Sequence, residues 1–446
     1  MSSPPPNDPA ARASALFFWA QIVGNAGLFL GLLLVTRALG PTGRGTVAFI
    51  TVTALVTAWI ARLGVTEATI VFAAQRPSAR PVLLSNILVF ATGAAVAGAA
   101  LVCGSLLLLP GARPPGVGEA ELAILALSIL VAGLADAGYR FLLGCSRFRE
   151  HALITITTSW IYPLAIAIFW AAFGLTVAQA ALIWAATQGL RALLLFSVGR
   201  REGGFGRPSR PLLGESIVFG LRAWVGTLAD SLNFRIDQIL IALIASEATL
   251  GIYVVAVNLS EVLMYLPGAA AMALLPLVAG SEPEGRLDRT LRAFRSAFLL
   301  TLASVLVAAV VVPPLLPLVF GAPFEASVKP FLLLLPGAIG FVAMGVFSNA
   351  LVASSYPSLS SVAPLISFVL GVTLDIVLIP PFGASGAAAA ASVSVLAGGA
   401  TALAIYRARV PFRLRDLVLP RAGDLDLLRA VAAPLLRVHV ARRGTS

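Results

Sequence analysis

Charged residues are scarce in this chain of 446 residues. Asp, Glu, Lys and Arg make up 11% of it, against about 25% in soluble domains. Hydrophobic residues make up 59%, and the mean hydropathy is +0.95. So few polar groups could not cover the surface of a folded chain in water. The composition therefore excludes a soluble globular protein and indicates an integral membrane protein.

Residues that support metal, covalent or nucleotide chemistry are also few. The two cysteines, Cys103 and Cys145, form neither a disulfide framework nor a metal-ligand spacing. The two histidines, His151 and His439, lie too far apart in sequence to indicate a zinc site. The only lysine, Lys329, follows no glycine-rich phosphate loop. We therefore expect no enzyme activity and no bound cofactor. If the protein transports a substrate, we expect the energy to come from an ion gradient, from a substrate gradient or from partner subunits.

The formal charge of +11 would suggest nucleic acid as the partner of a soluble domain. Here the basic residues lie between hydrophobic blocks, so we expect no nucleic-acid partner. Arginines gather after alternate blocks, which is typical of cytoplasmic loops. The groups fall at 76–80, 147–149, 200–210, 286–295 and beyond 406. This pattern predicts that both termini are cytoplasmic.

Hydrophobic runs of the length that crosses a bilayer, about 20 residues, recur along the whole chain. They fall at 14–38, 46–73, 82–110, 120–143, 152–173, 176–198, 214–244, 249–279, 296–320, 330–353, 358–380 and 384–406. Turn signals such as Gly40-Pro41 and Pro380-Pro381 separate neighbouring runs. The fold class we predict is an all-α polytopic membrane protein with about twelve transmembrane helices.

The two halves of the chain resemble each other at a nearly constant offset. The stretch Thr36–Phe49 falls on Leu243–Ala256, with Gly45 on Gly251, and a Phe-Gly pair precedes the last run of each half. An even number of helices in each repeat predicts two six-helix lobes related by a parallel repeat. The lobes would span 1–198 and 214–406, joined by a cytoplasmic linker at 199–213 and followed by a basic cytoplasmic tail at 407–446.

Charged side chains deep in a hydrophobic run usually face a bundle interior or a pathway. Arg62 shares a helical face with Thr51 and Thr66 and is a candidate cavity cation for an anionic substrate. The alternative is a structural arginine paired with another helix. Glu67 lies about 140° away around a continuous helix, so we expect it to serve another role.

Gln21 and Asn25 form a polar stripe on the first predicted helix. They are candidates for substrate binding, and interhelical hydrogen bonding explains them equally well. Asp136 and Arg140 are spaced i, i+4 at the inner end of the fourth predicted helix. We expect these two side chains to pair with each other.

The predicted helix 214–244 is the most polar one. Thr227, Asp230, Asn233 and Asp237 share one face if the helix is continuous, and Asp230 and Asp237 are candidates for binding a coupling Na⁺ or H⁺.

Two arginines of the same helix, Arg222 and Arg235, lie about 80° and 140° from that face and are further candidates for an anionic substrate. Glu261, near the middle of the next predicted helix, is either a third ion-coupling residue or a structural one.

Four stretches carry a resemblance to a known family. They are RALGPTGRGTVAF (Arg37–Phe49), FRIDQILIALIASEATLGIYVVA (Phe234–Ala256), LPGAAAMALLPLVA (Leu266–Ala279) and LIPPFGASGAAAAAS (Leu378–Ser392). With them the chain resembles bacterial polysaccharide-repeat flippases of the multidrug/oligosaccharidyl-lipid/polysaccharide flippase superfamily. Position 375, where relatives often have Asn, is Asp here, and the two further helices usual in lipid II flippases are not found.

The resemblance implies two lobes around a central cavity and alternating access. It implies a substrate of undecaprenyl-diphosphate-linked oligosaccharide, flipped to the outer leaflet of the bacterial inner membrane for surface polysaccharide biosynthesis. It also implies that arginines, here Arg62, Arg222 and Arg235, meet the diphosphate. Membrane lipid, a polysaccharide polymerase and glycosyltransferases are the partners expected. A cation-coupled multidrug exporter of the same fold and a non-transporting membrane scaffold in a polysaccharide-assembly complex remain as alternatives.

Overall fold

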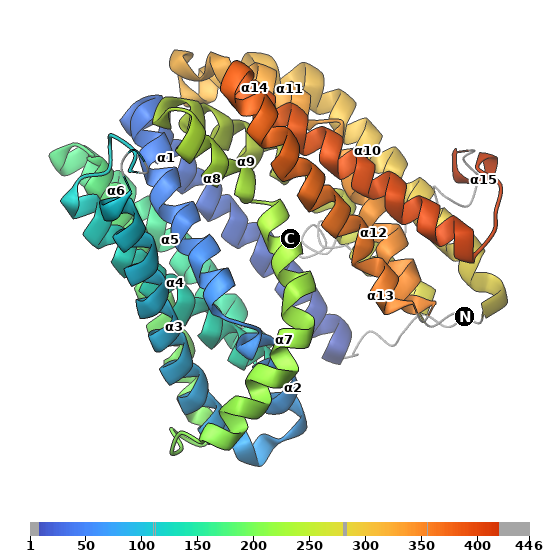
Figure 1. The fold of residues 1–446 in the computed structure, drawn as a ribbon, viewed down its shortest axis with the longest axis horizontal. Helices are drawn as coiled ribbons and strands as arrows, with labels where there is room; N and C mark the ends of the chain where they lie inside the picture. The colour runs from blue at the N-terminus through green and yellow to red at the C-terminus, as the bar shows by residue number, and fades with distance from the viewer. Residues whose placement is uncertain (1–8, 110, 112, 280–282, 355, 419–446) are drawn as a thin grey trace, which may run out of the picture. The chain divides into compact units, whose positions relative to one another are not determined.

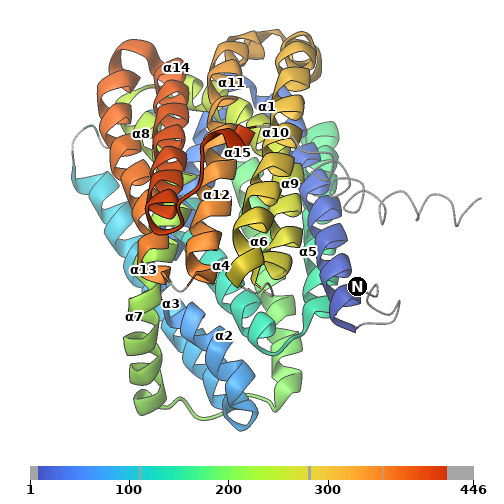
Figure 2. The same cartoon turned by 90° about the vertical axis from the view of Figure 1, so that its right-hand side faces the viewer.

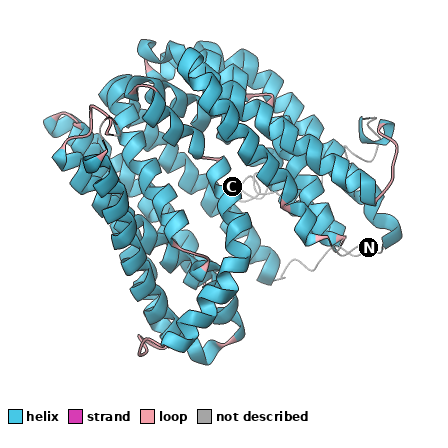
Figure 3. Cartoon of the chain, in the orientation of Figure 1, coloured by secondary structure: helices cyan, strands magenta, loops and turns pink. Residues whose placement is uncertain are grey.

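The computed structural model describes residues 9–109, 111, 113–279, 283–354 and 356–418. In these ranges every regular element is a helix (Figures 1 to 3). The α-helices are α1 (Pro9–Ala61), α2 (Val65–Gln75), α3 (Arg80–Leu108), α4 (Glu119–Gly144), α5 (Phe148–Phe173), α6 (Val177–Gly199), α7 (Arg210–Asn233), α8 (Ile236–Ile244), α9 (Glu247–Ala279), α10 (Pro283–Phe320), α11 (Val328–Leu334), α12 (Gly337–Ala353), α13 (Pro357–Ser360), α14 (Val362–Arg409) and α15 (Arg415–Val418). Three short 3₁₀ helices are η1 (Pro77–Ala79), η2 (Arg200–Glu202) and η3 (Ala322–Ser327).

The chain forms two compact units, Met1–Gly251 and Ile252–Ser446. The first unit holds α1 to α8 and the start of α9. The second holds the remainder of α9 and α10 to α15. This division follows compactness alone, so the lobe boundaries expected from the sequence repeat stay a prediction.

Seven helices of the described ranges are long and apolar enough to cross a membrane, and nine if each of two bent helix pairs forms one span. Two of the seven, Ala20–Ala61 and Ser358–Arg409, run over 42 and 52 residues, about twice the ~20 residues that one span needs. The protein is therefore a multi-pass membrane protein. The number of about twelve spans stays a prediction.

Each of these long helices contains one glycine at positive φ where the chain turns. In α1 this residue is Gly40, at φ 65°, and Figure 1 shows the chain running along one arm and returning along the next. Pro41 follows, and its fixed φ suits the first position of the second arm. In α14 the break is at Gly383, at φ 54°, two residues beyond the turn that the sequence suggests at Pro380-Pro381.

The start of α9 crosses the second arm of α1 at backbone contact. A β-carbon on Gly45 would overlap the backbone carbonyl of Glu247, and one on Gly251 would overlap the carbonyl of Pro41. Only glycine permits this approach at either position, because any larger residue would push the two helices apart.

In the second unit α12 packs against both α10 and α14 (Figure 2). Aromatic rings form the core between these three helices. The ring centroid of Phe347 lies 5.1 Å from that of Phe294 and 5.5 Å from that of Tyr406. The buried guanidinium of Arg295 donates to the Asp416 carbonyl at 2.6 Å. This bond ties the start of the predicted basic tail, which is described as far as residue 418, to α10.

The predicted linker 199–213 is bound to the start of α3. Asn86 donates to the Ser209 carbonyl at 3.0 Å and accepts from the Ser209 backbone N–H at 2.8 Å. Glu202 accepts from Arg80 at 2.7 Å and from Arg147 at 2.6 Å. Its carboxylate raises the pKa of Arg147 by hydrogen bonding. The linker thus joins α3 and the α4–α5 loop through one carboxylate.

Replacing Glu202 with glutamine is expected to lower the free energy of unfolding by about 1–2 kcal/mol, because two charge-assisted hydrogen bonds lose their ionised acceptor. Thermal unfolding of the detergent-solubilised protein measures the change. Glu150→Gln is the matched control, since Glu150 accepts from Arg147 alone, and we expect a change below about 0.5 kcal/mol. Equal effects of both variants would contradict the bridging role of Glu202.

Candidate functional site

The candidate site lies at a break between the end of α1 and the start of α2. The sequence predicts one continuous helix over 46–73, and this is wrong. The helix starts earlier, at Pro41, and is interrupted after Ala61, where Leu63 and Gly64 have φ of 44° and 75°. A left-handed conformation at leucine costs about 1–2 kcal/mol, so the surrounding structure must hold this break in place.

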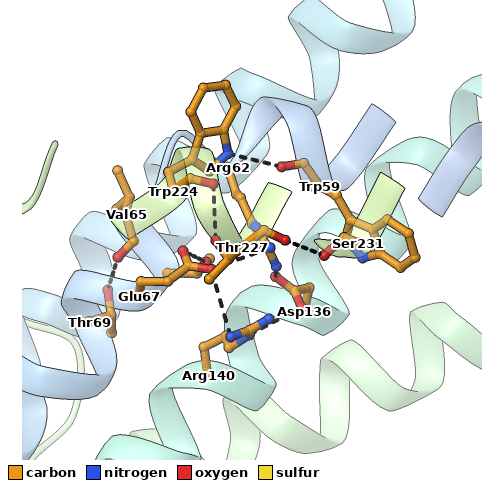
Figure 4. Close-up of polar contacts among 11 residues, drawn as sticks. Trp59, Arg62, Val65, Glu67, Thr69, Asp136, Arg140, Trp224, Thr227 and Ser231 are labelled. Atoms are coloured by element: carbon orange, nitrogen blue, oxygen red, sulfur yellow. Dashed lines mark hydrogen bonds and ion pairs between the residues drawn. The ribbon is translucent and has the colours of Figure 1, made fainter. Parts of the chain in front are cut away.

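Helix α7 packs directly on the break. The backbones of Gly64 and Gly220 touch, since a β-carbon on either glycine would overlap the other's backbone. The Trp224 indole N–H donates to the Trp59 carbonyl at 3.3 Å (Figure 4). That carbonyl lies in the last turn of α1, where carbonyl groups lack a partner within the helix. Helix α7 therefore both supports the break and caps the helix that precedes it.

The break brings four charged side chains together, which we name the charge quartet: Arg62, Glu67, Asp136 and Arg140. Arg62 lies 3.4 Å from the carboxylate of Glu67 and 3.8 Å from that of Asp136. Arg140 lies 3.8 Å from Glu67 and 3.4 Å from Asp136. Figure 4 shows the four side chains converging from α1, α2 and α4. Two cations and two anions thus form a ring with no net charge.

The helix ends favour this arrangement. Arg62 follows the carboxyl end of α1, and Glu67 lies in the first turn of α2. The helix dipole stabilises a cation at the carboxyl end of a helix and an anion at the amino end. The Thr66 hydroxyl also donates to Glu67 at 2.8 Å.

The ion pairs of the quartet are long, and one member, Arg62, is buried while the other three are half-buried. Arg62 is 5% exposed, and its Nε has no hydrogen-bond partner among the described residues. All four nitrogen–oxygen distances exceed the ~2.8 Å of a close charge-assisted hydrogen bond. The guanidinium of Arg62 is therefore neutralised without being fully hydrogen-bonded.

A small, mostly apolar pocket adjoins the quartet. Arg62, Thr66 and Asp136 line it together with α3 residues Phe90 and Ala94 and further small residues. Its walls come from α1 to α4, all in the first unit.

The other substrate-binding candidates lie on segments that do not carry the quartet. Gln21 is exposed and Asn25 half-buried on the first arm of α1, and Arg222 is exposed on α7. Arg235 is half-buried between α7 and α8, and its Nη1 donates to the Phe234 carbonyl at 2.7 Å. Their role in substrate binding therefore stays a prediction.

The ion-coupling role of Asp230, Asp237 and Glu261 also stays a prediction. The break between Asn233 and Ile236 puts Asp237 on α8, so the single polar face expected for a continuous helix is wrong. Asp237 is buried, and its carboxylate accepts from the Gln238 backbone N–H at 2.7 Å. Glu261 is half-buried on α9, in the second unit. The side chain of Asp230 lies outside the described residues.

Sequence reasoning missed the role of Glu67. The angle of about 140° between Glu67 and Arg62 applies only to a continuous helix, and the break removes that continuity. The pairing of Asp136 with Arg140 is confirmed at 3.4 Å, but its link to Arg62 was not foreseen. Gly64 directly after Arg62-Leu63 is the one local signal of a break, since glycine readily adopts positive φ.

Solved structures show which fold this is. The structure of the lipid II flippase MurJ in an inward closed conformation matches with a TM-score of 0.73 at 13% identity, over 97% of this chain and 93% of that one. An inward-facing MATE multidrug resistance transporter of the MOP superfamily matches with a TM-score of 0.69 at 16% identity, over 86% and 94%. A MOP superfamily transporter from Pyrococcus furiosus matches with 0.61 at 14%, over 90% and 94%. The comparison with curated proteins gave no match.

The chain therefore has the fold of these membrane transporter structures. A family model described as "Polysaccharide biosynthesis protein" matches residues 34–329, about two thirds of the chain. The protein belongs to this polysaccharide biosynthesis family, as the sequence resemblance indicated.

Proposed function

We propose that the protein flips an undecaprenyl-diphosphate-linked oligosaccharide from the cytoplasmic to the outer leaflet of the bacterial inner membrane. It does so by alternating access between two six-helix lobes, with both termini in the cytoplasm. Na⁺ or H⁺ is the coupling ion, and a polysaccharide polymerase and glycosyltransferases act beside it.

The charge quartet is the observation that carries the proposal. A lipid diphosphate presents several anionic oxygens, and guanidinium groups match these oxygens in pairs. Arg62 and Arg140 share two carboxylates at distances of 3.4–3.8 Å, so each can exchange a carboxylate for a phosphate oxygen. The helix break at Leu63-Gly64 lies between Arg62 and Glu67 and gives a joint at which this exchange can take place.

A cation-coupled drug exporter is the second candidate, and the other half of the quartet favours it. Glu67 and Asp136 are carboxylates in the interior of the first unit, and carboxylates would bind an organic cation. In the quartet, however, both carboxylates are neutralised by arginine, which leaves no net negative charge for a cation. A membrane scaffold would need no such charges at all.

Reconstitution into liposomes tests the proposal. We expect the purified protein to move a fluorescent undecaprenyl-diphosphate saccharide between leaflets, at least tenfold faster than protein-free vesicles do, and not to move undecaprenyl monophosphate. Movement of ethidium without movement of the saccharide lipid would support the exporter instead. Movement of neither, with the protein still required for surface polymer in cells, would support the scaffold.

A further inference from the structure

Arg44 is a second buried arginine, at the other end of the helix that carries Arg62. It lies in the first turn of the second arm of α1, after the turn at Gly40, and is 8% exposed. About 27 Å of helix separates it from Arg62. The charge quartet therefore cannot supply its counter-ion.

No hydrogen bond or ion pair of Arg44 occurs among the described residues, and its Nε is fully buried. Within the same ranges, the one titratable group that acts on it electrostatically is the phenol of Tyr162, which is 7% exposed. A phenol is uncharged at neutral pH, so it does not offset the charge. Glu247, whose backbone packs against Gly45 beside Arg44, has its carboxylate turned to another partner, since it accepts from the Gly116 backbone N–H at 2.6 Å.

The helix itself adds to the positive charge around Arg44. The second arm of α1 starts at Pro41, so Arg44 lies at its amino end, where the helix dipole disfavours a cation. Long side chains in helices point back toward that end. In that direction the guanidinium approaches the first turn, whose backbone N–H groups also attract an anion.

A further donor lies on the first arm of the same turn. Thr36 is 0% exposed, and within the described part of the chain its hydroxyl has no hydrogen-bond partner. Thr36 precedes Gly40 by as many residues as Arg44 follows it, so the two lie at similar heights on the arms of the hairpin. Packing around them is apolar, with Val35, Val47 and Tyr162 in one buried cluster.

An unpaired buried charge costs several kcal/mol, and a bound anion would remove that cost. We propose that Arg44 and Thr36, with the first turn of the second α1 arm, bind a small anion of halide size. The 8% exposure of Arg44 favours a halide over a phosphate group. This site is separate from the charge quartet and does not depend on the proposed flippase function.

Bromide tests the site directly. Crystals grown in bromide should show an anomalous peak within hydrogen-bond reach of the Arg44 guanidinium. Thermal unfolding in chloride should give a Tm about 2 °C or more above that in gluconate at equal ionic strength. Absence of the peak together with equal Tm values would overturn the proposal, and this test needs no variant.

Substitutions give the second arm of the test. Arg44→Met keeps the side-chain length and should abolish the difference in Tm between chloride and gluconate. Arg37→Met, an exposed arginine on the first arm, should retain it. A chloride effect of unchanged size in Arg44→Met would overturn the proposal. Stabilisation by inorganic phosphate and not by chloride would overturn the proposal that the site is limited to an anion of halide size.

Discussion

Replacing Arg62 with alanine is expected to reduce transport of the saccharide lipid to below a tenth of the wild-type rate. The substitution removes the cation that we assign to the diphosphate and leaves Glu67 and Asp136 sharing Arg140 alone. Removing one partner of a buried ion pair costs about 3–5 kcal/mol, so stability should fall as well. Vesicle transport and thermal unfolding in detergent measure the two effects separately.

A double variant distinguishes binding from folding. Arg62→Ala with Glu67→Gln leaves one cation and one anion, so the quartet is neutral again and most of the stability should return. Transport should stay low, because the phosphate-binding guanidinium is still missing. Arg207→Ala, in the exposed part of the linker, should affect neither. If the double variant transports normally, Arg62 has only a structural role and the diphosphate assignment is wrong.

Gly220→Ala is expected to have the second large effect. The new methyl group would overlap the backbone of Gly64, so α7 must move away from the helix break. Overpacking of this kind costs about 1–3 kcal/mol, and the hydrogen bond from Trp224 to Trp59 would be strained by the same shift. We expect lower thermal stability and a large loss of transport, since the break positions both Arg62 and Glu67.

Gly214→Ala is the matched control because it lies on the same helix, where a β-carbon would have no neighbouring atom within 4 Å. It should be neutral or stabilise α7 by up to about 1 kcal/mol, since alanine favours helix. Similar losses of transport in both glycine variants would refute a special role for the Gly64–Gly220 contact.

Hydrophobic run length predicted the helical membrane fold well, because a bilayer imposes the same length on every span. The turn at Gly40-Pro41 and the Asp136–Arg140 pair followed from local rules. The break at Leu63-Gly64 did not, since glycine is tolerated inside membrane helices. Gly64, next to the left-handed leucine, contacts the backbone of Gly220, more than 150 positions away in sequence, and no local pattern contains that contact.

Two helix breaks explain what helical periodicity does not predict among the candidate residues. Periodicity gives the angle between two residues only on an uninterrupted helix. Across the break Glu67 comes within 3.4 Å of Arg62, and the α7–α8 break puts Asp237 on a different helix from Thr227. The sequence shows which charged residues lie deep in hydrophobic runs. It does not show which of them pair, because pairing depends on breaks in the backbone that hydrophobic periodicity does not reveal.

The crossing of α1 and α9 is reciprocal. Gly45 meets the carbonyl of Glu247, and Gly251 meets that of Pro41, and each glycine lies four residues after the carbonyl-bearing residue of its own helix. Contacts that are reciprocal in this way define the interface of a twofold-symmetric dimer. The sequence offset that pairs Gly45 with Gly251 also pairs Pro41 with Glu247, so this crossing has the local twofold relation that the predicted repeat expects.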